Sequence, residues 1–155
     1  MLITDPRDPG FESYANEAEF TAYINKRGIV IAANANVSAC LIIAMDYLNG
    51  LCYLGEPEQP MQPLPFPRRG VGVDGVPQAM KEAQIRLAIL VEQGVNLMPI
   101  KEAGGNVTME RVEGAVTVQY DGGSFISEVE IPWLSGLLRG LQCPEGKFGF
   151  VDVTR

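Results

Sequence analysis

Apolar residues recur at helical spacing in several segments of the chain, and proline- and glycine-rich stretches separate these segments. Residues 1–12 contain two prolines, which predicts an extended N-terminal arm. Asn16 and Glu19 then have the spacing of a capping box. A first helix is therefore expected to run to residue 26, with Gly28 as its C-terminal stop.

Two further helices are predicted in the middle of the chain. One spans residues 36–49, and the other spans residues 77–93 and starts with a proline, which is favourable in a first turn. Residues 85–91 are apolar with one exception, so apolar groups occupy more than one face of this third helix. It is therefore either the central helix of the domain or a contact with a neighbouring subunit through Ile85 and Ile89.

The segment between these helices, residues 54–77, breaks the helical pattern. Five prolines between residues 57 and 67 exclude a helix or a central strand, so we expect an extended connection on the surface that serves as a contact segment. Arg68 and Arg69 are expected to point outward, toward solvent or toward the carboxylates of a partner. Residues 70–75 spell G-x-G-x-x-G, but no strand pattern precedes them, which favours a turn over a nucleotide site.

The C-terminal half is predicted to contain a β-hairpin, with strands at residues 107–112 and 115–120. A short fourth helix is expected to begin near Pro132, with Trp133 as its core anchor or, less favoured, as a platform on which bases stack. Residues 146–155 alternate like a strand, and this tail either pairs with the hairpin or docks on a neighbouring protein. The whole pattern predicts one domain over residues 1–155 with an α+β fold, predominantly α, containing about four helices, one hairpin and a strand-like tail.

Composition narrows the range of functions. The chain has no histidine, which removes the Ser/His and Cys/His nucleophile pairs and the usual zinc sites. We therefore expect no enzyme, no metal and no cofactor. With 12 basic and 19 acidic residues the net charge is −7, which disfavours a protein that must neutralise phosphates.

The remaining composition indicates a cytosolic protein. The three cysteines are scattered and form no C-x-x-C pair, so they are expected to be reduced core residues. No segment approaches the ~20 apolar residues of a membrane span, and the N-terminus lacks the pattern of an export signal.

Residues 64–71, Leu-Pro-Phe-Pro-Arg-Arg-Gly-Val, lead into a helix start at residues 76–84. With several other stretches, this segment resembles a phage and prophage family of DnaT-like single-stranded-DNA-binding proteins. Phe66 stands where the family usually has tryptophan. Residues 13–14, 18–23, 27–28 and 44–48 also match, and the predicted hairpin and the helix at Pro132 correspond, so the similarity covers most of the chain.

Members of this family are similar in size and helix order to head–tail connector proteins of tailed phages. That likeness implies a structural adaptor in the virion neck, assembled in the host cytoplasm as a ring of commonly about twelve subunits. Its expected partners are the portal protein and tail proteins, with double-stranded DNA passing through an acidic channel without specific binding. The alternative is a DnaT-like single-stranded-DNA-binding replication protein. The expected contact residues are Arg68, Arg69, Ile85, Ile89, Phe148, Phe150 and Val151.

Overall fold

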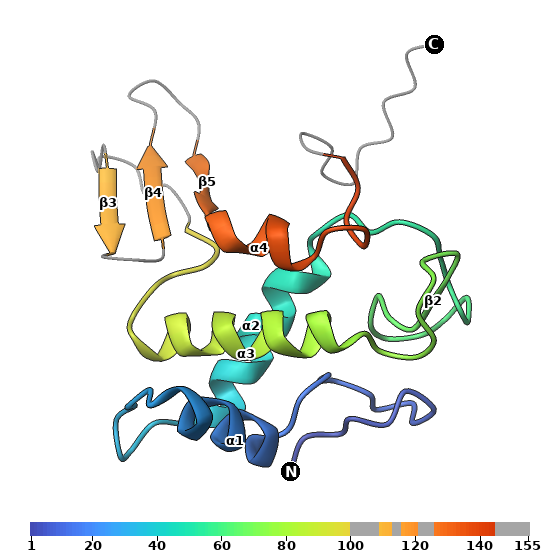
Figure 1. The fold of residues 1–155 in the computed structure, drawn as a ribbon, viewed down its shortest axis with the longest axis horizontal. Coiled ribbons are helices and arrows are strands. Elements are labelled where there is room, and N and C mark those ends of the chain that lie inside the picture. Colours follow the sequence, from blue (N-terminus) through green and yellow to red (C-terminus); the bar gives the residue numbers. More distant parts are fainter. Residues whose placement is uncertain (100–108, 113–115, 121–125, 145–155) are drawn as a thin grey trace.

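The computed structural model describes residues 1–99, 109–112, 116–120 and 126–144. Within these residues four helices and two small antiparallel sheets confirm the predicted α+β, predominantly α, fold (Figure 1). No helix in the described part of the chain is long and apolar enough to cross a membrane. The elements, in chain order, are α1 (Glu17–Arg27), α2 (Val37–Asn49), β1 (Glu56–Pro57), β2 (Arg68–Arg69), α3 (Gln78–Glu92), β3 (Met109–Val112), β4 (Val116–Tyr120), β5 (Ile126–Glu130) and α4 (Pro132–Leu137).

The capping box and the stop glycine that were predicted for the first helix are both present in α1. The Asn16 side chain accepts a hydrogen bond from the Glu19 amide at 2.9 Å, and the Glu19 carboxylate accepts one from the Asn16 amide at 2.9 Å. Gly28 ends α1 in the left-handed conformation with φ 65°, which glycine adopts without steric cost. The predicted hairpin is confirmed as β3–β4, with Glu110 opposite Val118, and β5 adds a third strand that was not predicted.

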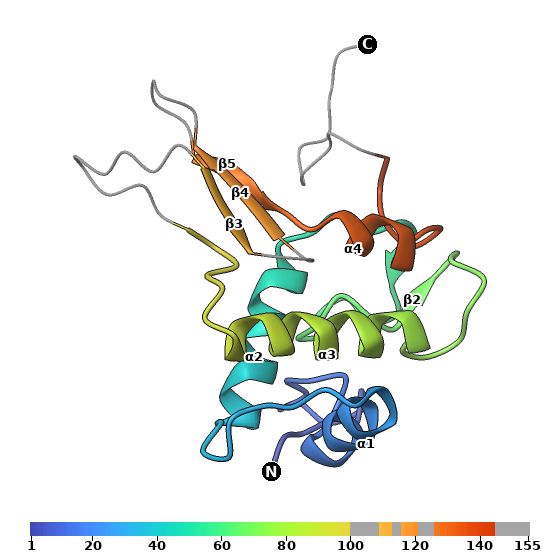
Figure 2. The ribbon, with the colours of Figure 1, turned by 60° about the vertical axis from the view of Figure 1, so that its left-hand side comes forward.

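The helix α3 is the central helix of the fold. It crosses α2, and in the two views α1 lies on one side of it and α4 on the other (Figures 1 and 2). Ile85 is 4% exposed and Ile89 7% exposed, so both pack inside the chain. The apolar groups around α3 therefore meet elements of the same subunit, and the assignment of Ile85 and Ile89 as contacts with a neighbour is corrected.

A buried amide joins the N-terminal segment to this central helix. The Oε1 atom of Gln84 accepts hydrogen bonds from the amides of Tyr14 (3.0 Å) and Ala15 (2.9 Å). Its Nε2 atom donates to Ser13 Oγ (2.7 Å) and to the carbonyl oxygen of Leu41 on α2 (3.0 Å). Gln84 is fully buried, and all four of its hydrogen-bonding positions are occupied. One side chain thus links α3, α2 and the residues that lead into α1.

A run of aromatic rings attaches the proline-rich segment to the core. Phe66 is fully buried and packs edge-on against Tyr14 (6.4 Å between ring centroids) and Tyr53 (5.1 Å). The Tyr14 hydroxyl accepts a hydrogen bond from the Phe66 amide at 3.1 Å, and the Tyr53 hydroxyl donates to the Leu48 carbonyl oxygen at 2.6 Å. Burial raises the pKa of both tyrosines, so both hydroxyls remain protonated at physiological pH.

Two of the cysteines form a disulfide, so the prediction of three reduced cysteines is wrong. Cys52 and Cys143 are bonded, with 5.4 Å between their Cα atoms, although 91 residues separate them. The Cys143 amide donates to the Cys52 carbonyl oxygen at 3.0 Å, and Tyr53 pairs with Gln142 in an antiparallel bridge. This backbone pairing places the two thiols opposite each other. Cys40 alone remains free and buried, and burial raises the pKa of its thiol.

Replacing Gln84 by Leu should lower the free energy of unfolding by about 3 kcal/mol, since it leaves the backbone amides of Tyr14 and Ala15 buried without partners. Gln93→Leu, at the exposed end of the same helix, is the matched control and should change it by less than ~0.5 kcal/mol. Urea denaturation measures both values. Equal stabilities of the two variants would contradict the role assigned to Gln84.

Replacing Cys52 and Cys143 together by Ser should cost about 2–4 kcal/mol, because the disulfide closes a long loop in the unfolded chain. Thermal unfolding with and without reductant measures this. Reductant should lower the melting temperature of the native chain and leave that of the double variant unchanged. Titration of three free thiols in the non-reduced, denatured protein would refute the pairing.

Candidate functional site

Four side chains from three helices form an alternating series of cationic and aromatic groups. The Arg27 guanidinium carbon lies 3.6 Å from the centroid of the Tyr23 ring. On the other side, Arg86 Nε donates a hydrogen bond to the Tyr23 hydroxyl at 2.8 Å. The guanidinium carbon of Arg86 lies 5.3 Å from the centroid of the Trp133 ring. We call these four residues the cation–aromatic row.

Local sequence and the central position of α3 produce this row. Tyr23 and Arg27 are four residues apart on α1, so they share one face of that helix. Arg86 interrupts the apolar run of α3, and Trp133 follows the proline that begins α4. Tyr23 is only 9% exposed, whereas Arg86 and Trp133 are half-buried and Arg27 is exposed. Arg27 is therefore open to solvent, whereas Arg86 and Trp133 are each only partly accessible.

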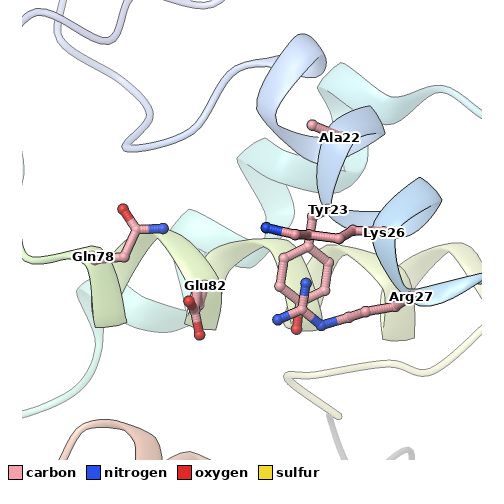
Figure 3. Close-up of a pocket in the computed structure, with 6 residues that line it drawn as sticks. All are labelled: Ala22, Tyr23, Lys26, Arg27, Gln78 and Glu82. Atoms are coloured by element: carbon pink, nitrogen blue, oxygen red, sulfur yellow. The ribbon is translucent and has the colours of Figure 1, made fainter.

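A groove of about 530 Å³ lies beside the row, between α1 and α3. The groove is open to solvent along much of its surface. Within the part of the chain that the structure describes, the side chains of Lys26, Gln78 and Glu82 have neither a hydrogen bond nor an ion pair. Their polar atoms are thus free to meet a ligand. The residues that line the groove are Ala22, Tyr23, Lys26, Arg27, Gln78 and Glu82 (Figure 3).

An ion pair fixes the two walls of the groove against each other. Lys81 Nζ on α3 lies 2.8 Å from Glu19 Oε1 on α1. Burial raises the pKa of Glu19, but the Lys81 ammonium and the Asn16 amide outweigh this effect and hold the pKa below its usual range. Glu19 is therefore ionised at neutral pH and forms an ion pair with Lys81. The cations that remain at the row and the groove are Lys26, Arg27 and Arg86.

This arrangement has the chemistry of a surface that binds a single nucleic-acid strand. Such surfaces combine cations that follow the phosphates with aromatic rings on which bases stack. Arginine serves both purposes, because its planar guanidinium pairs with phosphate oxygens and stacks on rings. Among the described residues, no three histidine, cysteine, aspartate or glutamate side chains gather where they could hold a metal ion.

The structure separates the two arginines that were predicted to point outward. Arg69 is exposed, as expected. Arg68 turns inward, where Nε donates to the Leu54 carbonyl oxygen (2.7 Å) and Nη2 to that of Gly55 (2.8 Å). Longer hydrogen bonds reach the carbonyl oxygens of Pro65 (3.3 Å) and Tyr53 (3.4 Å). The prediction of Arg68 as an outward contact residue is thus corrected, because its guanidinium satisfies backbone acceptors within the subunit.

The remaining predicted contact residues do not meet at a common site. Ile85 and Ile89 are buried, and Phe148, Phe150 and Val151 lie outside the described residues. The cation–aromatic row itself was missed by sequence reasoning. The available signals were the four-residue spacing of Tyr23 and Arg27 and the single charge within the apolar run of α3, but neither shows which residues meet in space.

Arg68→Ala should destabilise the protein by about 2 kcal/mol, because several carbonyl oxygens of the proline-rich segment lose their donors. Arg69→Ala removes the same charge from the neighbouring position and should change the free energy of unfolding by less than ~0.5 kcal/mol. Urea denaturation of the two variants gives the comparison. If the Arg68→Ala variant were as stable as the Arg69→Ala variant, the stabilising role assigned to the inward hydrogen bonds of Arg68 would be wrong.

Comparison with known proteins identifies the family. A family model described as "Putative DnaT-like ssDNA binding protein" matches residues 1–155, so the chain belongs to this family. Neither the curated proteins nor the solved structures provide a match. The family match overturns the expectation of a head–tail connector, with its ring, its portal and tail partners and its channel for double-stranded DNA. It agrees instead with the alternative reading, a DnaT-like single-stranded-DNA-binding protein.

Proposed function

We propose, from membership of the DnaT-like family, that this chain is a non-enzymatic protein that binds single-stranded DNA through the cation–aromatic row and the adjoining groove. The observation that carries the proposal is the alternation of Arg27, Tyr23, Arg86 and Trp133 across three helices. Two arginines and one partly exposed aromatic ring, that of Trp133, are therefore held next to one another, with Tyr23 between the arginines.

Each member of the row has a distinct part in this proposal. Arg27 is exposed and, together with Lys26 at the edge of the groove, provides positive charge for the phosphates. Trp133 is half-buried, so its ring is held by the domain while part of it remains accessible to a base. A stacked base contributes about 1–3 kcal/mol on such a ring. Tyr23 is largely covered and positions both arginines, one by its ring face and the other by its hydroxyl.

The salt dependence of binding follows from the number of cations. Lys26, Arg27 and Arg86 are three groups that could each neutralise a phosphate. For a single strand the slope of log K against log salt is about −0.7 for each neutralised phosphate, which gives a slope of about −2. The acidic remainder of the surface repels DNA, so binding is expected to be of modest affinity and confined to this site.

Trp133 is the only tryptophan of the chain, so its fluorescence reports directly on this site. Titration with a dC oligonucleotide at low salt should change the fluorescence with saturation. Replacing Lys26 and Arg27 together by Ala should weaken binding by about tenfold, roughly 1.4 kcal/mol, and reduce the magnitude of the salt slope by about 1.4.

Arg69→Ala is the control, because it removes an exposed cation from the proline-rich segment and should leave both quantities unchanged. Arg27 packs on Tyr23 and both cations lie in the last turn of α1, so their replacement should lower the melting temperature by only about 2–4 °C and leave the protein folded. Two results would show that the DNA binds elsewhere on the protein. One is binding by the native chain without a change in Trp133 fluorescence, and the other is an affinity of the double variant equal to that of the native chain. The absence of binding by the native chain would refute the function itself.

A further inference from the structure

One acidic side chain occupies the wall of the otherwise basic groove. Glu82 lines the groove from α3, opposite Lys26 and Arg27 of α1 (Figure 3). The Glu82 carboxylate has no hydrogen-bond or ion-pair partner in the part of the chain that the structure describes. Gln78 lies one turn earlier on the same helix and lines the same wall, again with a free side-chain amide.

A carboxylate at this position repels phosphate and attracts hydrogen-bond donors. In a DNA strand the donors are on the bases, mainly the exocyclic amino groups of cytosine, adenine and guanine. Uracil and thymine present carbonyl oxygens instead, and their one ring N–H lies between two of these oxygens. The charges of the groove therefore orient a bound nucleotide, with phosphate at Lys26 and Arg27 and the base edge at Glu82.

We propose that Glu82 is a specificity-determining residue that accepts a hydrogen bond from the exocyclic amino group of a base, so that the site prefers amino-bearing bases to uracil and thymine. This inference rests on the proposed function. Gln78 complements Glu82, because its amide donates to the ring nitrogen that lies next to the amino group in cytosine and adenine. In this arrangement the Lys26 ammonium pairs with the phosphate of the nucleotide.

Homo-oligomers of deoxycytidine and deoxyuridine are the appropriate probes, because their bases differ at the amino-bearing carbon and the adjacent ring nitrogen and share the rest of the ring. Labelled 12-mers are titrated by fluorescence anisotropy at neutral pH, where cytosine is unprotonated. The native protein should bind the deoxycytidine oligomer about tenfold more tightly, within the discrimination usual for a base-edge contact.

Glu82→Gln should reduce this ratio to about twofold or less, since an amide turns either its oxygen or its nitrogen toward the base. Asp46→Asn is the matched control, because it removes one exposed carboxylate from α2, outside the groove, and should leave the ratio unchanged. Thermal melting of both variants verifies that they are folded.

Three results would overturn the proposal in distinguishable ways. Equal binding of the two oligomers by the native protein would refute base reading while leaving single-strand binding intact. An equal gain in affinity for both oligomers in Glu82→Gln, with the ratio preserved, would show that Glu82 acts only by repelling phosphate. Failure of the native protein to bind either oligomer would refute the proposed function and this inference with it.

Discussion

A carboxamide without access to water must find all of its hydrogen-bonding partners inside the protein, and Gln84 meets this requirement only if three segments keep their present positions. Its partners are residues 13–15 and the carbonyl oxygen of Leu41 on α2. Asn16, which caps α1, follows directly after the bonded segment. Gln84 therefore determines where α1 begins against α3, and through α1 it determines whether Tyr23 reaches Arg86. The groove and the cation–aromatic row depend on this one buried side chain.

The proline-rich segment illustrates a second constraint, the balance of donors and acceptors. Proline has a carbonyl oxygen and no N–H, so a segment with five prolines between residues 57 and 67 has more acceptors than donors. Two side chains supply the missing donors. Arg68 bonds carbonyl oxygens on both arms of the loop, and Gln62 Nε2 donates to those of Leu64 (2.7 Å), Pro65 (3.0 Å) and Pro67 (3.0 Å). The inward direction of Arg68 follows from this deficit, and Arg69, one residue later, has no such acceptors and remains at the surface.

Local signals in the sequence predicted the helices well, because a capping box, a stop glycine and an apolar period act within a few residues. The signals failed where partners are distant in the chain. Cys52 and Cys143 are 91 residues apart, and nothing in their surroundings indicates the backbone bridge that aligns them. The central position of α3 was one of two possible interpretations, since apolar residues on several faces of a helix do not reveal whether they pack within the subunit or against a neighbour. The row was not predictable at all, because positions 23, 27, 86 and 133 meet only after three helices have packed.

Net charge is a similarly coarse guide to the proposed site. A net charge of −7 is a sum over the chain, whereas a phosphate responds to the charges within a Debye length, about 8–10 Å at physiological salt. Asp and Glu residues elsewhere therefore do little to cancel Lys26, Arg27 and Arg86 at the site. They do affect the rest of the surface, where an excess of negative charge suppresses non-specific adhesion of DNA. An acidic protein that binds a single strand must concentrate its few cations and support them with aromatic rings. Because stacking is less sensitive to salt than ion pairing, the contribution of Trp133 should persist at salt concentrations where that of the cations has largely been lost.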